Sequence, residues 1–485
     1  MGSTRAGRVQ CQLLTHVVSK MEHSPKLTTV DRRLARRRYF PACCISTAGV
    51  HIDSTLFLVP VRQLMFSPPN RSRKTAATLL IFTQTYPPDP AAVGQHFADA
   101  ASELARRGHC VVVFTAGSGY NDPKLRYPSR EFAPDGVEVR RFPFSSLGKR
   151  NMFMRAVGAV NFMVQCFARA LFTPKLKGML VSTSPPLIGV VAALAGMIRG
   201  VPYGYWAMDL NPDQLIALGN IREKGLLAKT LEAFNRFILR RARIIVALDD
   251  LMASRLHSRD AHSAEIAVIP PWSPDAALSP VPRDSNAFRS ELRVGNDFVV
   301  MYSGNHTSAN PLDTLLDAAV QLNDRSDVKF VFVGDGVAKR KVEQYIRDHA
   351  LTNTFSLPYQ PRESLNASLS AADVHVVTLG DGFAGIIHPC KVYGAMAVAR
   401  PLLYFGPSTS HLSDLISRYG IGWRVSHGDV AGAVARIRAI AAMPAEELEQ
   451  IGKKARAALL RDLSPEILCG RFCDLVEEKL ELANA

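Results

Sequence analysis

A carboxylate and a lysine in this sequence stand at positions where side chains commonly meet a ligand. Asp209 directly follows the predicted strand 203–208 and is followed by Leu-Asn-Pro. A carboxylate at the carboxyl end of a strand can orient or deprotonate a substrate hydroxyl. An N-cap or a plain loop carboxylate is the competing interpretation, and the sequence leaves both open.

Lys391 lies in a second such segment, where a loop containing Gly385 and Ile386 runs into a predicted helix. Pro389 is expected at the first helical position, where proline is favoured. Backbone N–H groups at that helix terminus, together with Lys391, could hold a nucleotide diphosphate. The alternative is that Lys391 is an ordinary solvated lysine.

The loop after the first predicted strand is the third candidate segment. It runs from Tyr86 through Pro-Pro-Asp-Pro to Gly94, and His96 follows. We expect Gly94 to permit a backbone turn that other residues resist, and the helix N-terminus behind it favours an anionic or hydroxyl-rich ligand. An ordinary loop between a strand and a helix is the alternative interpretation.

The elements that must position these segments form a strand–helix alternation that runs twice. The predicted strands are 79–83, 110–114, 178–182, 203–208 and 244–247 in the first run and 298–302, 328–333, 374–378 and 401–404 in the second. Such alternation predicts an α/β fold of two doubly wound, Rossmann-like domains with parallel sheets. Ligands bind at the carboxyl ends of such strands, so two domains suggest two ligands held face to face.

A chain of 485 residues is long enough to bury two cores of ordinary domain size. The predicted parts are a basic N-terminal extension at 1–74, a first domain at 75–272, a Pro-, Ser- and Asp-rich linker at 273–292, a second domain at 293–462 and a final helix at 463–485. That last helix could pack back on the first domain.

The formal net charge of +15 is concentrated at the N-terminus, where residues 1–75 carry thirteen basic and three acidic residues. The remaining body is mildly basic, which suits anionic substrates or a membrane surface and does not demand nucleic acid. Met65 is a candidate for the true start, and we expect residues 1–64 to be dispensable.

The eight cysteines show no paired metal spacing, and reduced thiols are favoured over a disulfide framework. The longest apolar stretch, 187–198, is far shorter than the ~20 residues that span a bilayer, so no transmembrane helix is expected. The basic, apolar segment 149–177 has the composition of an interfacial helix, although a core-packed helix with a solvated edge fits equally well.

Several further motifs follow one another in a fixed order. They are Ser-Pro-Pro, an apolar helix and Asp-Leu-Asn-Pro at 184–212, Tyr-Ser-Gly-Asn at 302–305, Gly-Asp-Gly at 334–336 and Pro-Cys-Lys to Pro at 389–401. Together with the Pro-Pro loop at 86–94, this series resembles glycosyltransferase family 4. More narrowly, it resembles the bacterial polysaccharide branch with N-acetyl-L-fucosamine and colanic-acid-type transferases, over about residues 77–480.

The resemblance implies a GT-B fold, with two Rossmann-like domains facing across a cleft, and a retaining, metal-independent transfer of a hexosyl or N-acetylhexosaminyl group. The donor would be a nucleotide-sugar, expected to be a UDP-sugar, bound in the C-terminal half; no other cofactor is expected. The acceptor would be a polyprenyl-diphosphate-linked sugar or a saccharide, as in lipopolysaccharide or exopolysaccharide synthesis. Such an enzyme would be cytoplasmic, with peripheral association at the inner face of the plasma membrane as an option, and would have no nucleic acid partner.

The resemblance also assigns residues to the site. Asp209 would be catalytic, and Gly94 and His96 would lie in the acceptor-side loop. The donor-binding residues would be Gly304, Asn305, His306, Gly334, Gly336, Gly385, Ile386 and Lys391.

The sequence departs from the family pattern at several of these positions. The glutamate that grips the nucleotide ribose in the family falls on Gly394, and a frequent family glycine is Ala399. The loop after Gly304 lacks the Arg and Lys that many relatives place against the diphosphate. Lys391 and His306 are left to supply that contact.

Other functions are less well matched. A dinucleotide-dependent oxidoreductase would need a third glycine where Lys339 follows Gly334 and Gly336, and a single-domain, metal-dependent transferase would need Asp-x-Asp, which does not occur. A UDP-sugar epimerase of the same fold stays open. So does a non-catalytic partner subunit that has lost the family glutamate at Gly394.

Overall fold

The computed structural model describes residues 77–89, 91–119, 124–143, 152–259, 264–273 and 278–482. All of them belong to one compact unit that begins at Pro69. The predicted extension 1–74 and the candidate start at Met65 lie outside the described residues.

The first half of this unit is built on an eight-stranded sheet with the order β3-β4-β2-β1-β5-β6-β7-β8. Its strands are β1 Thr78–Phe82, β2 Cys110–Ala116, β3 Arg130–Phe132, β4 Glu138–Phe142, β5 Leu176–Ser182, β6 Tyr203–Trp206, β7 Ile244–Ala247 and β8 Glu265–Val268. Neighbouring strands are parallel except β3, which pairs antiparallel with β4. The central strands are buried on both faces, as their continuous apolar sequences predict.

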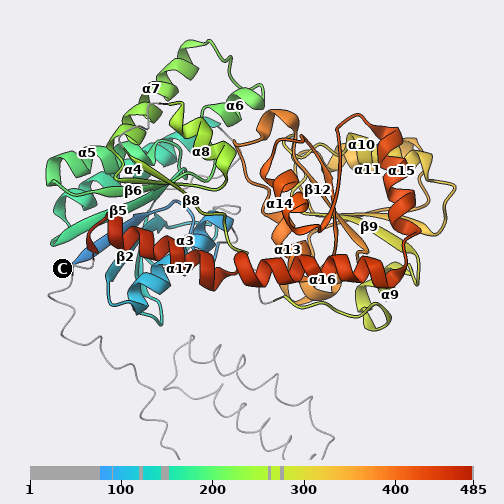
Figure 1. Ribbon diagram of the computed structural model, residues 1–485. Coiled ribbons are helices and arrows are strands. Elements are labelled where there is room, and N and C mark those ends of the chain that lie inside the picture. The colour runs from blue at the N-terminus through green and yellow to red at the C-terminus, as the bar shows by residue number, and fades with distance from the viewer. Residues whose placement is uncertain are drawn as a thin grey trace, which may run out of the picture. The chain divides into compact units, whose positions relative to one another are not determined.

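Helices cover both faces of this sheet. They are α3 Ala92–Arg106, α4 Met152–Phe172, α5 Ile188–Arg199, α6 Asp213–Ala217, α7 Leu226–Arg241 and α8 Asp250–His257. Figure 1 shows α4, α5 and α7 on one face of the sheet and α3 on the other. This division follows from right-handed crossovers, because the chain moves from β1 to β2 in one direction and from β5 to β6 in the opposite direction.

The last helix of the chain, α17 (Pro465–Lys479), packs beside α3 and completes the core of the first half (Figure 1). The ring of Phe472 lies 4.2 Å from that of Trp206, which is 1% exposed. On the surface, Arg107 forms ion pairs with Asp474 and Glu477. The C-terminal end of the sequence is therefore part of the N-terminal fold.

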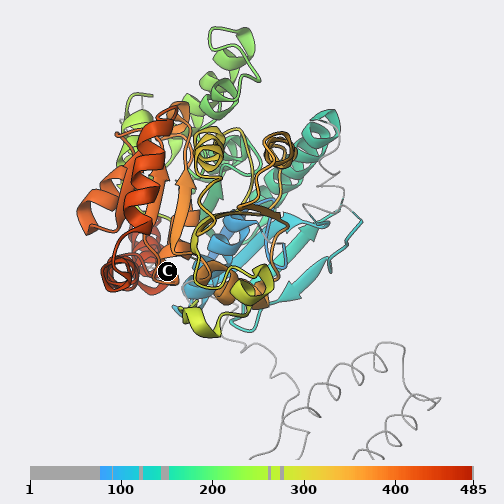
Figure 2. The same cartoon turned by 90° about the vertical axis from the view of Figure 1, so that its right-hand side faces the viewer.

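The second half contains a six-stranded parallel sheet with the order β11-β10-β9-β12-β13-β14. Figure 2 shows the molecule with this half toward the viewer. Its strands are β9 Phe298–Ser303, β10 Val328–Val333, β11 Thr354–Leu357, β12 Val374–Thr378, β13 Leu402–Phe405 and β14 Gly422–Val425. Its helices are α9 Ala287–Leu292, α10 Asp313–Gln321, α11 Lys339–Asp348, α12 Leu365–Ser370, α13 Lys391–Ala397, α14 His411–Tyr419, α15 Val430–Ala441 and α16 Ala445–Asp462, with short 3₁₀ turns at Arg283–Ser285, Arg362–Ser364 and Asp381–Phe383. Two parallel sheets in tandem confirm the predicted fold class.

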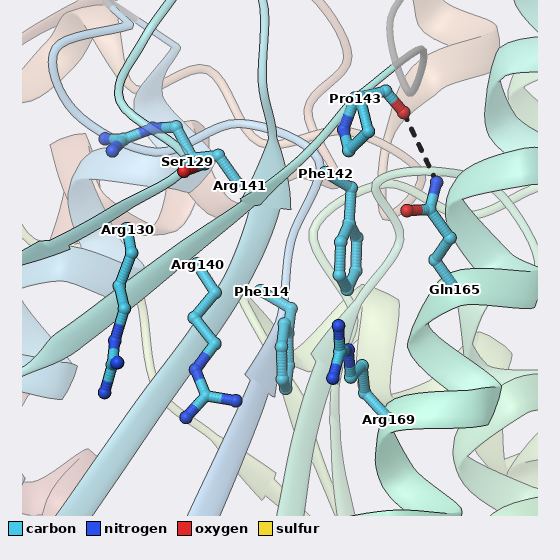
Figure 3. A pocket seen from close by; sticks show the side chains of 9 residues that line it. All are labelled: Phe114, Ser129, Arg130, Arg140, Arg141, Phe142, Pro143, Gln165 and Arg169. Atoms are coloured by element: carbon cyan, nitrogen blue, oxygen red, sulfur yellow. Dashed lines mark hydrogen bonds between the residues drawn. The ribbon is translucent and has the colours of Figure 1, made fainter.

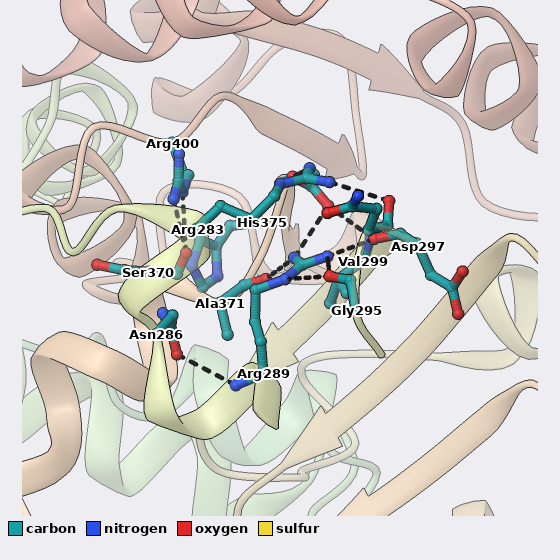
Figure 4. A network of polar contacts seen from close by, with 12 residues as sticks. Arg283, Asn286, Arg289, Gly295, Asp297, Val299, Ser370, Ala371, His375 and Arg400 are labelled. Carbon is teal, nitrogen blue, oxygen red and sulfur yellow. Dashed lines mark hydrogen bonds and ion pairs between the residues drawn. The ribbon is translucent and has the colours of Figure 1, made fainter. Parts of the chain in front are cut away.

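Part of the segment predicted as a linker is fixed to this second sheet. Arg289 in α9 is 3% exposed, and its guanidinium donates to the carboxylate of Asp373 and to the carbonyl oxygen of Ala371 (Figure 4). Arg283 also forms an ion pair with Asp373. The carboxylate of Asp373 in addition accepts a hydrogen bond from the backbone N–H of Val299, at 2.8 Å. A buried carboxylate thus joins the linker segment to β9 and β12.

Candidate functional site

Three glycines shape the loops at the carboxyl ends of β9 and β10. Gly304, Gly334 and Gly336 have φ angles of +144°, +134° and +138°, which side-chain-bearing residues rarely adopt. A Cβ at Gly334 would lie 2.0 Å from the carbonyl oxygen of Gly304, and one at Gly336 would lie 2.3 Å from that of His306. The two loops therefore touch only because these positions lack side chains.

Lys391 extends across this pair of loops from the start of α13. Its ammonium donates to the Tyr302 hydroxyl and, at 3.0 Å, to the carbonyl oxygen of Asn305. Its aliphatic end occupies the space above Gly304, where a Cβ would come within 2.3 Å of the lysine Cε. Burial lowers the pKa of Lys391 to about 7, so this ammonium is poorly compensated until an anion joins it.

The start of α13 differs from the prediction for Pro389. The helix begins at Lys391 with Cys390 as its N-cap, so Pro389 precedes the helix. The N–H of Cys390 donates to His388 and that of Tyr393 to Cys390, which forms a tight turn before the first helical residue. That turn uses backbone donors, so the cationic groups at the loops are side chains. They are Lys391 and Lys339, whose ammonium donates to the carbonyl oxygens of Gly334 and Leu357.

The other two residues of the β9 loop behave differently from each other. Asn305 is an exposed residue, and its side-chain oxygen lies beside Gly336, where a Cβ would come within 2.4 Å of it. His306 is 0% exposed, and neither ring nitrogen has a hydrogen-bond partner among the described residues. Burial, followed by the charges of Lys391 and Lys339, lowers the pKa of His306 to about 4. His306 is therefore neutral at physiological pH and supplies no positive charge beside Lys391.

Gly385 and Ile386 lie where the second half touches the first. A Cβ at Gly385 would come within 2.8 Å of the Cβ of Leu251 in α8. The carbonyl oxygen of Ile386 accepts the backbone N–H of Leu210 at 3.0 Å, while its own N–H donates to Phe383. The loop that leads to Lys391 is thereby bonded directly to the residue that follows Asp209.

Asp209 lies three residues beyond β6, in the loop fixed by this hydrogen bond. Its backbone N–H donates to the hydroxyl of Thr183 at 3.3 Å. Burial raises the pKa of Asp209 to about 6, and its charge is the second cause, after burial, of the raised pKa of Cys390. The structure thus brings a carboxylate of the first half close to the residue that precedes Lys391.

The acceptor-side loop is organised differently from the prediction. Gly94 lies in the first turn of α3 rather than in the loop, and its role is to allow close approach, since a Cβ would meet the Thr85 carbonyl oxygen at 2.7 Å. His96 is 2% exposed, with its ring 5.1 Å from that of Trp272. Burial, and secondly the charge of His388, lowers the pKa of His96 to about 4. Both residues therefore help to pack α3 against the sheet.

A buried pair that the sequence analysis did not identify supports the Lys391 loop. Asp249 accepts the N–H of Met252 as the N-cap of α8, and its second oxygen lies 3.3 Å from Nδ1 of His388. The other ring nitrogen of His388 lies 2.8 Å from the hydroxyl of Tyr393 in α13. Asp249 lies two residues beyond the end of β7, so its position after a strand was the available signal.

The structure shows the surroundings of two positions that depart from the family pattern, Gly394 and Ala399. A Cβ at Gly394 would meet only Leu369 Cδ1, at 3.5 Å, so the position has room for a side chain. Ala399 has φ +53°, the left-handed conformation that glycine adopts without strain. At position 394 this chain therefore lacks a carboxylate that the backbone could accommodate. At position 399 it has an alanine in a backbone conformation that favours the family glycine.

The described residues contain neither a metal-binding cluster nor a membrane-spanning helix. No group of three or more His, Cys, Asp or Glu side chains there is arranged to hold a metal ion. No helix in the same part of the chain is both long and apolar enough to cross a bilayer.

The fold and these loops define an α/β protein of two Rossmann-like domains, with the candidate site residues in loops that follow strands in both. The family described as "Glycosyl transferase 4-like domain" matches residues 91–272, and the family described as "Glycosyl transferases group 1" matches residues 284–458.

Two relatives match most of this chain. The protein named as glycosyltransferase WbjE of Pseudomonas aeruginosa is 24% identical over 380 residues, which cover 77% of this chain and 90% of WbjE. The protein named as colanic acid biosynthesis glycosyl transferase WcaI of Escherichia coli is also 24% identical, over 76% of this chain and 92% of WcaI.

Solved structures show the same fold. Sucrose-phosphate synthase of Thermosynechococcus elongatus superposes with a TM-score of 0.66 at 16% identity, over 84% of this chain and all of that one. HepE of Anabaena, in complex with UDP and glucose, superposes with a TM-score of 0.61 at 15% identity, over 83% of this chain and all of that one. The chain belongs to the GT-B glycosyltransferases, within the family 4 group of bacterial polysaccharide biosynthesis, which confirms the predicted family.

Proposed function

We propose that this glycosyltransferase transfers a hexosyl or N-acetylhexosaminyl group from a UDP-sugar to a lipid-linked or saccharide acceptor, with retention of configuration. The observation that carries the proposal is the hydrogen bond from Leu210 to Ile386. It holds the loop of Asp209 beside the loop of Lys391, and in this proposal the carboxylate and the ammonium from the two halves would serve one site.

Lys391 would bind the donor diphosphate. Its ammonium has two neutral oxygen partners, Tyr302 and Asn305, and no carboxylate partner among the described residues. An incoming diphosphate would supply the missing negative charge and form charge-assisted hydrogen bonds. The same positive charge would stabilise the leaving diphosphate in a transfer that uses no metal ion. That HepE is described with UDP supports a uridine nucleotide as donor.

Asp209 would orient the acceptor hydroxyl and favour its deprotonation. With a pKa of about 6, its carboxylate is ionised at neutral pH but is basic enough to attract a proton. In a retaining transfer by front-face attack, the leaving diphosphate accepts the acceptor proton, and no protein nucleophile is required. Asp209 would then act chiefly by positioning and by favourable charge.

The acceptor would be presented at a membrane surface. Helix α4 exposes a row of apolar side chains, in which Val160 is 54% exposed, Val164 61% and Phe172 83%. Its sequence contains no acidic residue. A helix with this composition suits peripheral contact with a bilayer that carries a polyprenyl-linked acceptor, as in cell-surface polysaccharide synthesis.

The proposal is tested first by ligand-induced thermal stabilisation with UDP-, GDP- and dTDP-sugars. Stabilisation by UDP-sugars above the other two, followed by transfer to a polyprenyl-diphosphate-linked sugar with an α-linked product from an α-linked donor, is the expected result. Binding without transfer or donor hydrolysis would instead indicate the non-catalytic subunit. Interconversion of the free sugar nucleotide would indicate the epimerase.

A further inference from the structure

A second cavity lies in the first half, away from the loops of Lys391. It has a volume of about 500 Å³ and opens between the β3–β4 edge of the sheet and the C-terminal part of α4. Figure 3 shows Arg130 and Arg140 from the strands on one side and Arg169 from the helix on the other. The rings of Phe114 and Phe142, stacked 5.1 Å apart, lie between them. We call this group of five residues the arginine pocket.

The arginine pocket holds more positive charge than its own carboxylates balance. Arg130 and Arg140 both pair with one carboxylate, that of Glu138, at 2.6 Å each. Arg169 has no acceptor for its guanidinium among the described residues. Counted over the described residues, three guanidinium groups and one carboxylate leave two positive charges uncompensated around the cavity.

Two other polar side chains that line this cavity, Arg141 and Gln165, have protein partners. Arg141 also lines the cavity, but its side chain is 1% exposed, and it donates to Pro87 and pairs with Glu131. Gln165 beside Arg169 is held by the carbonyl oxygen of Pro143 (Figure 3). Arg169 is exposed and is not held in a comparable way.

Exposed apolar side chains lie next to the arginine pocket on the same helix, α4. Val160, Val164 and Phe172 recur at helical spacing on the exposed side of α4, and Arg169 lies beside that row on the same helix. Met197 and Ile198 at the end of the adjacent helix α5 are 51% and 64% exposed. A cationic pocket at the margin of an apolar surface matches a molecule with an anionic head and an apolar chain.

We propose that the arginine pocket binds the phosphate or diphosphate group of a lipid whose chain lies along the exposed face of α4. The two uncompensated charges match a diphosphate, and the phenylalanine rings offer a dry floor for the first carbons or the sugar of the head group. This inference deepens the membrane contact of the proposed function by naming the group that is recognised.

The test measures binding of the full chain to vesicles by sedimentation at ~0.15 M salt, where the Debye length is about 8 Å. The vesicles contain phosphatidylcholine alone, phosphatidylcholine with phosphatidylglycerol, or phosphatidylcholine with a polyprenyl diphosphate. Arg169→Gln is the pocket variant. Arg236→Gln is its matched control, because Arg236 on α7 is half exposed and carries the same charge in the same layer of helices.

Arg169→Gln should weaken binding to phosphate-bearing vesicles at least about tenfold, because charge-assisted hydrogen bonds to the phosphate are lost. Arg236→Gln should weaken it by no more than about fivefold, the contribution of one cation near an anionic surface. The basic N-terminal extension contributes equally to every variant. Equal losses for both variants, or no loss for Arg169→Gln, would overturn the proposal.

Two arms identify the source of the phosphate. Tighter binding of the polyprenyl diphosphate than of phosphatidylglycerol at equal charge supports recognition of the diphosphate, and equal binding supports a general lipid phosphate. Val164→Ser should weaken vesicle binding and leave binding of free pyrophosphate unchanged. If free pyrophosphate binds as tightly as the lipid and Val164→Ser has no effect, the ligand is a soluble phosphate and the lipid proposal is wrong.

The outcome is separable from that of the proposed transfer reaction. UDP-glucose stabilisation, measured without vesicles, should be the same for the wild-type protein and Arg169→Gln, since Arg169 lies on α4 of the first half and Lys391 does not line its cavity. Normal vesicle selectivity without sugar transfer would remove the proposed function and leave the arginine pocket in place.

Discussion

The ammonium of Lys391 lies 4.2 Å from the centre of the Tyr302 ring and donates a hydrogen bond to its hydroxyl. Lys391 is the first residue of α13, and Tyr302 is the penultimate residue of β9. The aliphatic part of the lysine side chain fits between them because Gly304 has no side chain. The aromatic face and two neutral oxygens stabilise the ammonium less than water and a carboxylate would. The resulting low pKa makes the charge of Lys391 responsive to pH and to bound anions.

The affinity for a sugar nucleotide should therefore fall as pH rises through 7. Below pH 6, Lys391 is protonated before the donor binds; above pH 7 a proton must first be taken up. With a pKa of about 7 in the free protein, the Kd for UDP-glucose should rise about tenfold between pH 6 and pH 8. The ligand has no phosphate group that titrates in this range, so titration calorimetry reports the protein.

Variants of Lys391 supply the controls for that pH dependence. Lys391→Arg keeps the charge at all these pH values and should give a flat profile with retained binding. Lys391→Ala should also be flat, with affinity reduced by about 1.5–3 kcal/mol. A Kd of the wild-type protein that does not change between pH 6 and pH 8 would show that Lys391 does not meet the diphosphate.

The carboxylate that the family places at position 394 should be restorable. Residue 394 lies one turn after Lys391 on the same face of α13, and an added side chain has room beside Leu369. Gly394→Glu should tighten UDP-glucose binding about tenfold or more through a charged hydrogen bond to the ribose. It should also stabilise the helix by up to about 1 kcal/mol, because glycine is a poor helix former.

Two controls separate these effects. Gly394→Ala should give the helix stabilisation without the tighter binding. Pyrophosphate, which lacks a ribose, should bind Gly394→Glu no better than the wild-type protein. Equal tightening of UDP-glucose binding by alanine and glutamate would contradict a ribose contact at this position.

The buried carboxylate of Asp373 should be important for stability. It is 5% exposed and balances the charges of Arg289 and Arg283. Asp373→Asn keeps the shape and removes the charge, so it should lower the free energy of unfolding by about 3–5 kcal/mol. Asp327→Asn, which breaks an exposed pair with Arg325, should cost about 0.2–1 kcal/mol in the same urea titration. Similar losses for both variants would show that the Asp373 network carries no special stability.

The inner strands other than β4 (EVRRF) were predictable because each is a short, largely apolar run between turn residues. The edge strands were not, and β8 and β14 illustrate why. Both are four residues long and incompletely buried, and both contain charged residues, Glu265 and Arg424. An edge strand is defined by its neighbour in the sheet, which a local pattern does not specify.

The candidate site was predictable in its parts rather than in its assembly. Asp209 and Lys391 each follow from a local rule about strand ends and loops. The contact between Leu210 and Ile386 joins residues far apart in the sequence, and no local rule contains it. Gly94 shows the opposite error, because a glycine needed for close packing has the same appearance in a sequence as one needed for a turn.

The last prediction concerns Asp209 and uses Asp213 as its control. Asp209 has a pKa raised by burial to about 6, so kcat/KM should rise with pH through about 6 as the carboxylate ionises. Asp209→Asn should abolish this limb of the profile and lower turnover by about 10²–10⁴, while UDP-glucose affinity stays unchanged. Asp213, four residues later, forms ion pairs with Arg259 and Arg255. Asp213→Asn should therefore keep the pH profile and lower stability instead. Transfer by Asp209→Asn at the wild-type rate would leave Asp209 as a structural residue of the loop after β6.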